Sequence, residues 1–183
     1  MLKDEFGTIN PFEEQKVLEK FFLLPLKSKV SWFFVQGFQA IHRGLYLPGN
    51  LSLFNGIEIS IRQTLHLVAG KSINADLDRW QIMKDPMLKR AHLSGLPIGA
   101  LSFPGEDIIE AITSGQSTSK IVSQRNNFCH GNVHEFIQYV TGDPDNKFFT
   151  PECTRELANI LMEISEKWVL ALTEFCKLNG ILA

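Results

Sequence analysis

The chain has 183 residues, of which 44% are hydrophobic and 21% are charged. This length suits one domain with a buried core and hardly suffices for two, and the composition excludes a wholly disordered chain. The net charge of -2 argues against a protein that binds polyanions through general positive charge. We therefore expect one globular domain over residues 1–183.

The cysteines and the apolar stretches bear on the cellular compartment. The chain has three cysteines without close pairs, Cys129, Cys153 and Cys176, and this odd number argues against a disulfide framework. The N-terminus lacks the apolar core of a secretion signal, and the most apolar stretch, residues 21–41, is interrupted by Pro25 and two lysines. We expect a cytoplasmic protein with no membrane partner.

The first part of the chain predicts three helices. Asn10 is a suitable cap before Pro11, and the first helix should end near Pro25. A second helix fits residues 28–45 because its apolar positions follow a helical stripe. Residues 47–50 predict a turn, and a third helix should span residues 52–69 before Gly70.

The rest of the chain predicts less regular secondary structure. Asp85-Pro86 should end a helix, and residues 88–103 predict an irregular connection because they contain two glycines and a proline. The last helix is the clearest, with Thr150 as its cap and Gly180 after its end. The candidate helices lie at residues 75–84, 104–112, 119–129, 133–140 and 151–179. We expect an all-α fold, a bundle of five or six helices.

Charges are distributed unevenly. No Asp or Glu occurs in residues 20–57 or in residues 111–134, and the second window contains Lys120 and Arg125. If the two windows meet in space, they form a mildly positive surface that could receive phosphate.

The run Arg125-Asn126-Asn127-Phe128-Cys129-His130 holds the most informative chemistry. Arginine offers a permanent charge and a fork of donors that fits a phosphate, and histidine exchanges a proton near neutral pH. Attack by a ribose 2′-hydroxyl on the adjacent phosphate needs a phosphate ligand and a group that transfers a proton, and it needs no metal. On an unbroken helix the two positions lie roughly 140° apart, so they suit a wide groove better than a compact pair.

The segment from Arg125 to Asn132 resembles the Arg-x4–6-His signature of the HEPN superfamily, in which a polar residue commonly follows the arginine. The resemblance implies a small helical bundle that usually dimerises, so that two motifs face one cleft. Many HEPN domains are metal-independent ribonucleases of toxin–antitoxin, abortive-infection or CRISPR-linked defence systems, and others are binding or assembly modules. The resemblance therefore implies an endoribonuclease without a cofactor, with RNA and a second copy as partners and, in toxin–antitoxin systems, an antitoxin protein.

The resemblance also implies residue roles. Arg125 would be the phosphate ligand, His130 the acid or base, and Asn126 a polar helper. Further candidates for contacts with the substrate are Lys120, Asn127, Asn132, His134 and Glu58. Glu58 forms a polar line with Arg62 and His66 on the third helix and could orient Arg125 or His130. The alternative is a solvated helix face with an ordinary Glu–Arg pair.

Two other interpretations compete for these residues. Cys129, His130 and His134 could hold zinc together with Cys153 or Cys176, although neither Cys-x-x-Cys nor His-Glu-x-x-His is present. Alternatively, Arg125 could pair with an acid of the last helix while His130 donates to a helix-terminal carbonyl. We expect no metal, and we expect a homodimer with the motif at or beside its interface.

Overall fold

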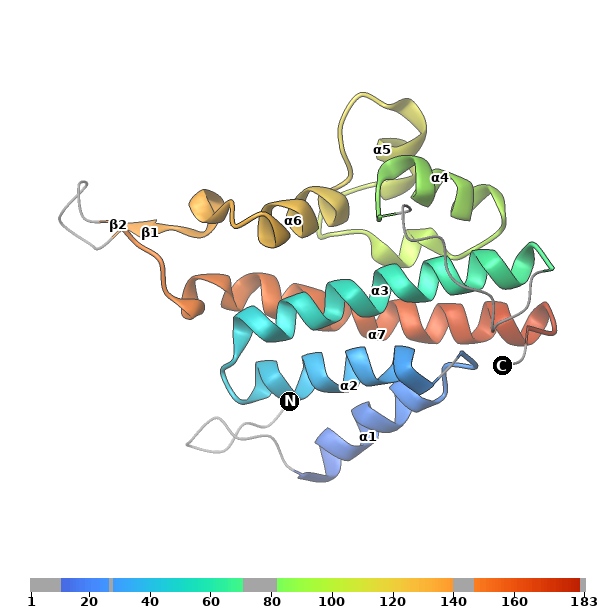
Figure 1. Ribbon diagram of the computed structural model, residues 1–183, viewed down its shortest axis with the longest axis horizontal. Helices are drawn as coiled ribbons and strands as arrows, with labels where there is room; N and C mark the ends of the chain where they lie inside the picture. Colours follow the sequence, from blue (N-terminus) through green and yellow to red (C-terminus); the bar gives the residue numbers. More distant parts are fainter. Residues whose placement is uncertain (1–10, 27, 71–81, 140–146, 182–183) are drawn as a thin grey trace.

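The structure, a computed structural model, describes residues 11–26, 28–70, 82–139 and 147–181. Within these ranges the fold is all-helical, apart from one pair of two-residue strands (Figure 1). This confirms the expected all-α class. The described residues form seven α-helices rather than five or six, and one of them, α4, includes residues that were expected to be an irregular connection.

The first three helices are α1 (Pro11–Phe22), α2 (Ser28–His42) and α3 (Tyr46–Val68). The turn predicted at residues 47–50 is wrong, because these residues form the first turn of α3. Proline is tolerated there, since the first N–H groups of a helix have no partner within it. The real connection is shorter and includes Gly44, whose φ of 75° favours glycine.

Glycines allow α2 and α3 to pack very closely. A Cβ atom added to Gly49 would lie 2.5 Å from Ile41 Cγ1, and one added to Gly37 would lie 2.6 Å from Leu53 Cδ2. At Gly56 the added atom would lie 3.1 Å from the Phe34 ring. Only glycine fits these contacts without displacing its neighbours. Helices α2 and α3 both contribute side chains to the core, among them Val30, Phe34, Phe38, Leu53, Phe54, Ile57 and Ile61.

The next elements are α4 (Asp85–Leu93), a 3-10 turn η1 (Ile98–Leu101), α5 (Ile108–Ser114) and α6 (Lys120–Cys129). Two expectations are wrong here. Asp85-Pro86 begins a helix instead of ending one, and residues 88–103 form most of α4 and all of η1. The predicted short helix begins at Ile108 rather than 104, and α6 matches its prediction. The predicted helix over residues 75–84 lies mostly outside the described residues.

The chain then passes through the 3-10 turn η2 (Val133–Phe136) to strand β1 (Gln138–Tyr139), which pairs antiparallel with β2 (Lys147–Phe148). The helix predicted over residues 133–140 is therefore wrong. Valine, isoleucine and tyrosine are frequent in this segment, and these residue types favour strands. A 3-10 turn η3 (Pro151–Thr154) leads into the long last helix, α7 (Arg155–Leu178).

Helix α3 is the central element, because it contacts α2, α6 and α7 (Figure 1). Its contact with α7 includes a buried polar link. The indole N–H of Trp168 donates to Ser60 Oγ at 2.8 Å, and that hydroxyl donates to the Ile57 carbonyl at 2.7 Å. Burial of a satisfied donor and acceptor fixes the register of the two helices. No helix within the described ranges combines the length and apolar character needed to cross a membrane.

The glycine contact predicts a large effect of one methyl group. Gly49→Ala should lower the free energy of unfolding by about 1–3 kcal/mol, because overpacking outweighs the better helix propensity of alanine. Gly99→Ala is the matched control, since a Cβ atom there meets no atom within 4 Å. Urea denaturation of both variants measures the difference. Equal stability of the two variants would contradict the close-packing argument.

Candidate functional site

Two carboxylates from other elements hold the start of α6. Asp85 accepts hydrogen bonds from the Ser119 hydroxyl at 2.5 Å and from the Ser119 N–H at 3.3 Å. Glu106 accepts from the Lys120 N–H at 2.6 Å and from the Phe103 N–H at 3.0 Å. These bonds satisfy N–H groups that have no partner within the helix, and negative charge is favourable at a helix N-terminus. Helix α6 is thereby tied to α4 and to the loop before α5.

The end of α6 explains the residues that follow the histidine. Gly131 has a φ of 68°, its N–H bonds the Phe128 carbonyl at 3.4 Å, and the Asn132 N–H bonds the Asn127 carbonyl at 2.8 Å. This pair of bonds is a Schellman motif, which needs a left-handed residue directly after the cap. His130 is that cap and is exposed. No hydrogen bond joins its imidazole to another side chain or carbonyl in the part of the chain that the structure describes.

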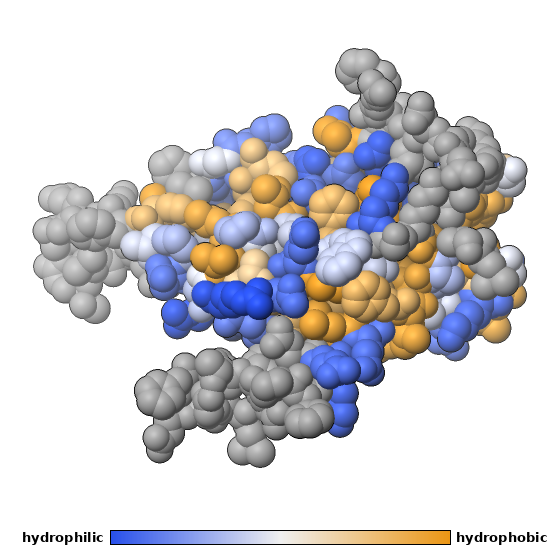
Figure 2. Space-filling model, turned by 60° about the horizontal axis from the view of Figure 1, so that its bottom comes forward, coloured by the Kyte–Doolittle hydropathy of each residue, from blue (hydrophilic) through white to orange (hydrophobic). Residues whose placement is uncertain are grey.

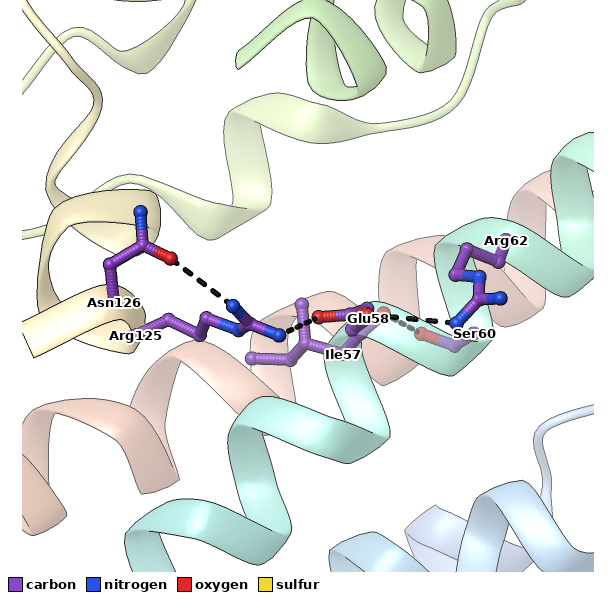
Figure 3. Close-up of polar contacts among 6 residues, drawn as sticks. All are labelled: Ile57, Glu58, Ser60, Arg62, Arg125 and Asn126. Atoms are coloured by element: carbon purple, nitrogen blue, oxygen red, sulfur yellow. Dashed lines mark hydrogen bonds and ion pairs between the residues drawn. The ribbon is translucent and has the colours of Figure 1, made fainter. Parts of the chain in front are cut away.

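Arg125 lies in the contact between α6 and α3 (Figure 3). Its Nη2 donates to Glu58 Oε2 at 3.0 Å, and the two side chains expose only 13% and 10% of their surface. The other Glu58 oxygen lies 3.6 Å from Arg62 Nη1. The partner of Arg125 is thus an acid of α3 and not one of α7, and Glu58 is buried rather than on a solvated face. The carboxylate orients the guanidinium and offsets part of its charge.

The asparagines of the motif contribute local bonds. Asn126 Oδ1 accepts from Arg125 Nη1 at 3.1 Å, so both terminal nitrogens of the guanidinium have partners (Figure 3). Asn132 Nδ2 donates to Asn127 Oδ1 at 3.2 Å across the end of the helix. Asn126 therefore positions Arg125, while Asn127 and Asn132 reinforce the cap that presents His130.

Two candidate residues, Lys120 and His134, are not shown to lie near the motif. Lys120 is at the opposite end of α6, about 7.5 Å along the axis from Arg125. It lines a surface depression of about 440 Å³ together with Glu106, Asp107 and Glu110. The other charged residues that line this depression are all acidic, so Lys120 is not grouped with the motif. His134 belongs to η2, and its side chain lies outside the described residues.

The two acid-free windows meet, but through apolar groups. The rings of Phe54 and Phe128 have centroids 6.2 Å apart, and Phe128 also contacts Phe136 at 6.0 Å. The charged contact between the two helices comes from Glu58, directly after the first window. The expected positive surface is therefore replaced at this contact by an aromatic cluster and one ion pair.

The cysteines differ in their surroundings. Cys176 is fully buried, and burial raises the pKa of its thiol to about 11, so it is protonated and unreactive at neutral pH. Cys129 is exposed on α6. Among the described side chains, no group of three His, Cys, Asp or Glu residues is placed to hold a metal. The zinc interpretation also involved His134, whose side chain is outside the description.

Comparisons of the chain with protein-family models, with curated proteins and with solved structures gave no match. The candidate site therefore rests on its own geometry and on the motif. Sequence reasoning did not find the two carboxylates that fix the start of α6. Asp85 was interpreted as part of a helix end, and no motif marks Glu106.

The carboxylate contacts predict how firmly α6 is held. Asp85→Ala removes the acceptor for two Ser119 donors and should lower the free energy of unfolding by about 1–2 kcal/mol. Glu110→Ala, which removes an exposed acid from the first turn of α5, is the control and should change stability by less than about 0.5 kcal/mol. Hydrogen exchange at the Ser119 and Lys120 amides should accelerate only in the first variant. Unchanged exchange would show that this anchor is unimportant.

The Glu58–Arg125 pair predicts non-additive effects. Glu58→Gln leaves a mostly buried guanidinium without its counter-charge and should destabilise the protein by about 1–3 kcal/mol. In an Arg125→Met background the same change should matter much less, which a double-mutant cycle measures. Glu163→Gln changes an exposed carboxylate of α7 and serves as the control. Additive losses in the cycle would argue against a direct interaction.

Proposed function

We propose that the protein is a cytoplasmic, metal-independent endoribonuclease of the toxin–antitoxin or antiphage-defence type, with a HEPN-like helical bundle. The observation on which this depends is the placement of Arg125, Asn126 and His130 on the single short helix α6. Arg125 is oriented by Glu58 and Asn126, and His130 is exposed at the carboxyl end. Arginine and histidine of one helix could then contact the same stretch of RNA.

The spacing along the helix supports a shared substrate. His130 follows Arg125 by five positions, which corresponds to a rise of about 7.5 Å along the axis. A phosphodiester and the neighbouring ribose can span this distance. The guanidinium would hold the phosphate oxygens through N–H groups not used by Glu58 and Asn126. Because its position is already fixed, little side-chain entropy is lost when the phosphate binds.

The reaction assigns one proton transfer to His130. As a base, the imidazole removes the proton of the 2′-hydroxyl, and the O2′–P bond forms while the P–O5′ bond breaks. The 5′-oxygen leaves with a proton from an acid, and the products are a 2′,3′-cyclic phosphate and a 5′-hydroxyl. One histidine can serve as base or as acid, so a second copy would supply the other group. The shared cleft in a homodimer stays a prediction.

A second candidate function is a non-catalytic RNA- or protein-binding assembly module. The observation that favours it is the burial of Arg125, whose side chain is 13% exposed and already paired. In this interpretation Arg125 joins α3 to α6, and the motif has only a structural role. The exposed large apolar side chains also suit an assembly role.

Cleavage of single-stranded RNA in EDTA tests the proposal. The wild-type protein should cleave, His130→Ala should lower the rate about 10²–10⁴-fold, and Arg125→Lys should also lower it because lysine lacks the fork. His92→Ala on α4 is the matched control, since the sequence assigns that histidine no role. We expect its rate to equal the wild-type rate.

Three outcomes would contradict the proposed mechanism: activity that requires a divalent metal, activity that survives in His130→Ala, or no cleavage of any RNA. The third would favour the assembly module if RNA still binds. Growth during induction gives a second readout. A toxin should slow growth unless an antitoxin protein is supplied, and Arg125→Ala should relieve this effect.

A further inference from the structure

Helix α4 packs on the protein with one side and exposes the other. Three apolar residues of the helix are buried, and Pro86, Lys89, Arg90 and Leu93 on the opposite side are exposed. These four positions lie within an arc of roughly 100° around the helix axis. Figure 1 places α4 at the edge of the bundle, with α3 between it and α2. We name these four residues the α4 face.

The α4 face carries positive charge and no acid. Lys89 makes no hydrogen bond or ion pair with another described residue, and no Asp or Glu occurs in residues 86–105. The acids on either side of this range, Asp85, Glu106 and Asp107, all accept hydrogen bonds from backbone N–H groups. Glu110 of α5, which packs on α4, is exposed and is the remaining acid of residues 84–110. The positive charge of the face is therefore directed to solvent.

An exposed leucine lies beside these charges. Leu93 exposes 76% of its surface. It follows Lys89 by four positions and Arg90 by three, so the three side chains are neighbours on the helix surface. Contact with an apolar group of a partner would remove this leucine from water, which is favourable. The face thus offers one apolar contact between two positive charges.

RNA is a less suitable occupant of the α4 face than a protein. Surfaces for single-stranded nucleic acid combine positive charge with aromatic rings that stack on the nucleobases. No Phe, Tyr or Trp occurs in residues 82–102. A strand that ran from Arg125 to α4 would also pass the carboxylates of Asp85 and Glu106 at the start of α6. Positive charge together with an exposed leucine therefore favours an acidic protein segment.

The exposed apolar residues of α1 and α2 lack this charge pattern. Phe22 and Trp32 expose 51% and 50% of their surface and meet edge to face, with ring centroids 5.6 Å apart. They belong to the side that Figure 2 brings forward, where hydrophobic residues lie beside hydrophilic ones. Charges of both signs occur there, including the ion pair between Lys20 and Glu166. Charge therefore identifies no partner for that side, whereas the α4 face carries a single sign.

We propose that the α4 face binds an acidic helix of another protein. An apolar side chain of that helix covers Leu93, and carboxylates beside it face Lys89 and Arg90. A helix with leucines three or four positions apart and glutamates between them has the complementary pattern. The α4 face is small, so the contact belongs to the weak and reversible class of interfaces. It forms whether or not the Arg125 site cleaves RNA.

An NMR titration with a synthetic peptide tests the proposal. The peptide has about 18 residues, enough to form a helix, with leucines every three or four positions among glutamates. It should shift the amide signals of residues 86–93, and a matched peptide with lysines in place of the glutamates should not. Leu93→Ser should raise the dissociation constant about tenfold and Lys89→Glu about fivefold. Leu45→Ser and Lys29→Glu, which change exposed residues of the same types away from α4, are the controls and should leave it unchanged.

Charge reversal tests the sign of the partner. Lys89→Glu combined with Arg90→Glu should transfer binding from the glutamate peptide to the lysine peptide. Lys89→Glu alone should keep the wild-type melting temperature and the wild-type ribonuclease rate, because its side chain is exposed and lies outside the motif. No shift on α4, equal binding of the two peptides, or full affinity in Leu93→Ser would overturn the proposal. Shifts of the same amides by single-stranded poly(U) or by phosphatidylserine vesicles, but not by the glutamate peptide, would assign the face to RNA or to a membrane and would also overturn it.

Discussion

The close approach of α2 and α3 is the constraint from which the other contacts of the bundle follow. Gly37, Gly49 and Gly56 remove side chains at the points where the two backbones meet, and the neighbouring Leu53, Ile41 and Phe34 fill the space. Helix α3 is thereby fixed on one side. Its other faces then meet α7 and α6 in a defined rotation, which places Ser60 beneath Trp168 and Glu58 opposite Arg125.

The placement of α6 depends on contacts at three levels along its length. Carboxylates of Asp85 and Glu106 hold its first residues, the Glu58–Arg125 pair holds its middle, and the glycine turn after His130 defines its end. Charge-assisted bonds of this kind are directional, so they determine the orientation of the helix as well as its position. The His130 imidazole at the end of the helix is exposed, in contrast to the mostly buried Arg125 side chain. Helix α6 thus presents an arginine held by two partners and, five positions later at its cap, an accessible histidine.

Sequence patterns identified the elements whose signals are local. Helix α6 follows a polar cap and ends before glycine, and α7 has a long apolar stripe, so both could be placed closely. Helix α4 could not, because Asp85-Pro86 is compatible with a helix end and with a helix start. Its true role depends on Ser119, which is 34 residues further along the chain. Proline alone cannot distinguish the two cases.

The candidate site likewise contains residues that local sequence signals identify and a residue whose role depends on a distant part of the chain. Arg125, Asn126 and His130 could be found because they are nearly adjacent in the sequence and have recognisable chemistry. Glu58 was one of several residues that could have contacted Arg125. It precedes Arg125 by 67 positions, and the sequence does not reveal which face of α3 meets α6. The exposure of Phe22 and Trp32 could not be predicted at all. Phenylalanine and tryptophan at helical spacing are compatible with burial, and only the assembled bundle shows which rings remain outside.

The carboxylates at the start of α6 also affect how an anion would approach this helix. The amino end of a helix is ordinarily its phosphate-binding end, because free N–H groups and the helix dipole attract negative charge there. In this protein Asp85 and Glu106 already occupy that position, and they would repel an RNA backbone. An anion near α6 would therefore meet less repulsion at the carboxyl end, where Arg125 and His130 lie. The two ends of α6 therefore differ in charge, which disfavours an anion at the amino end.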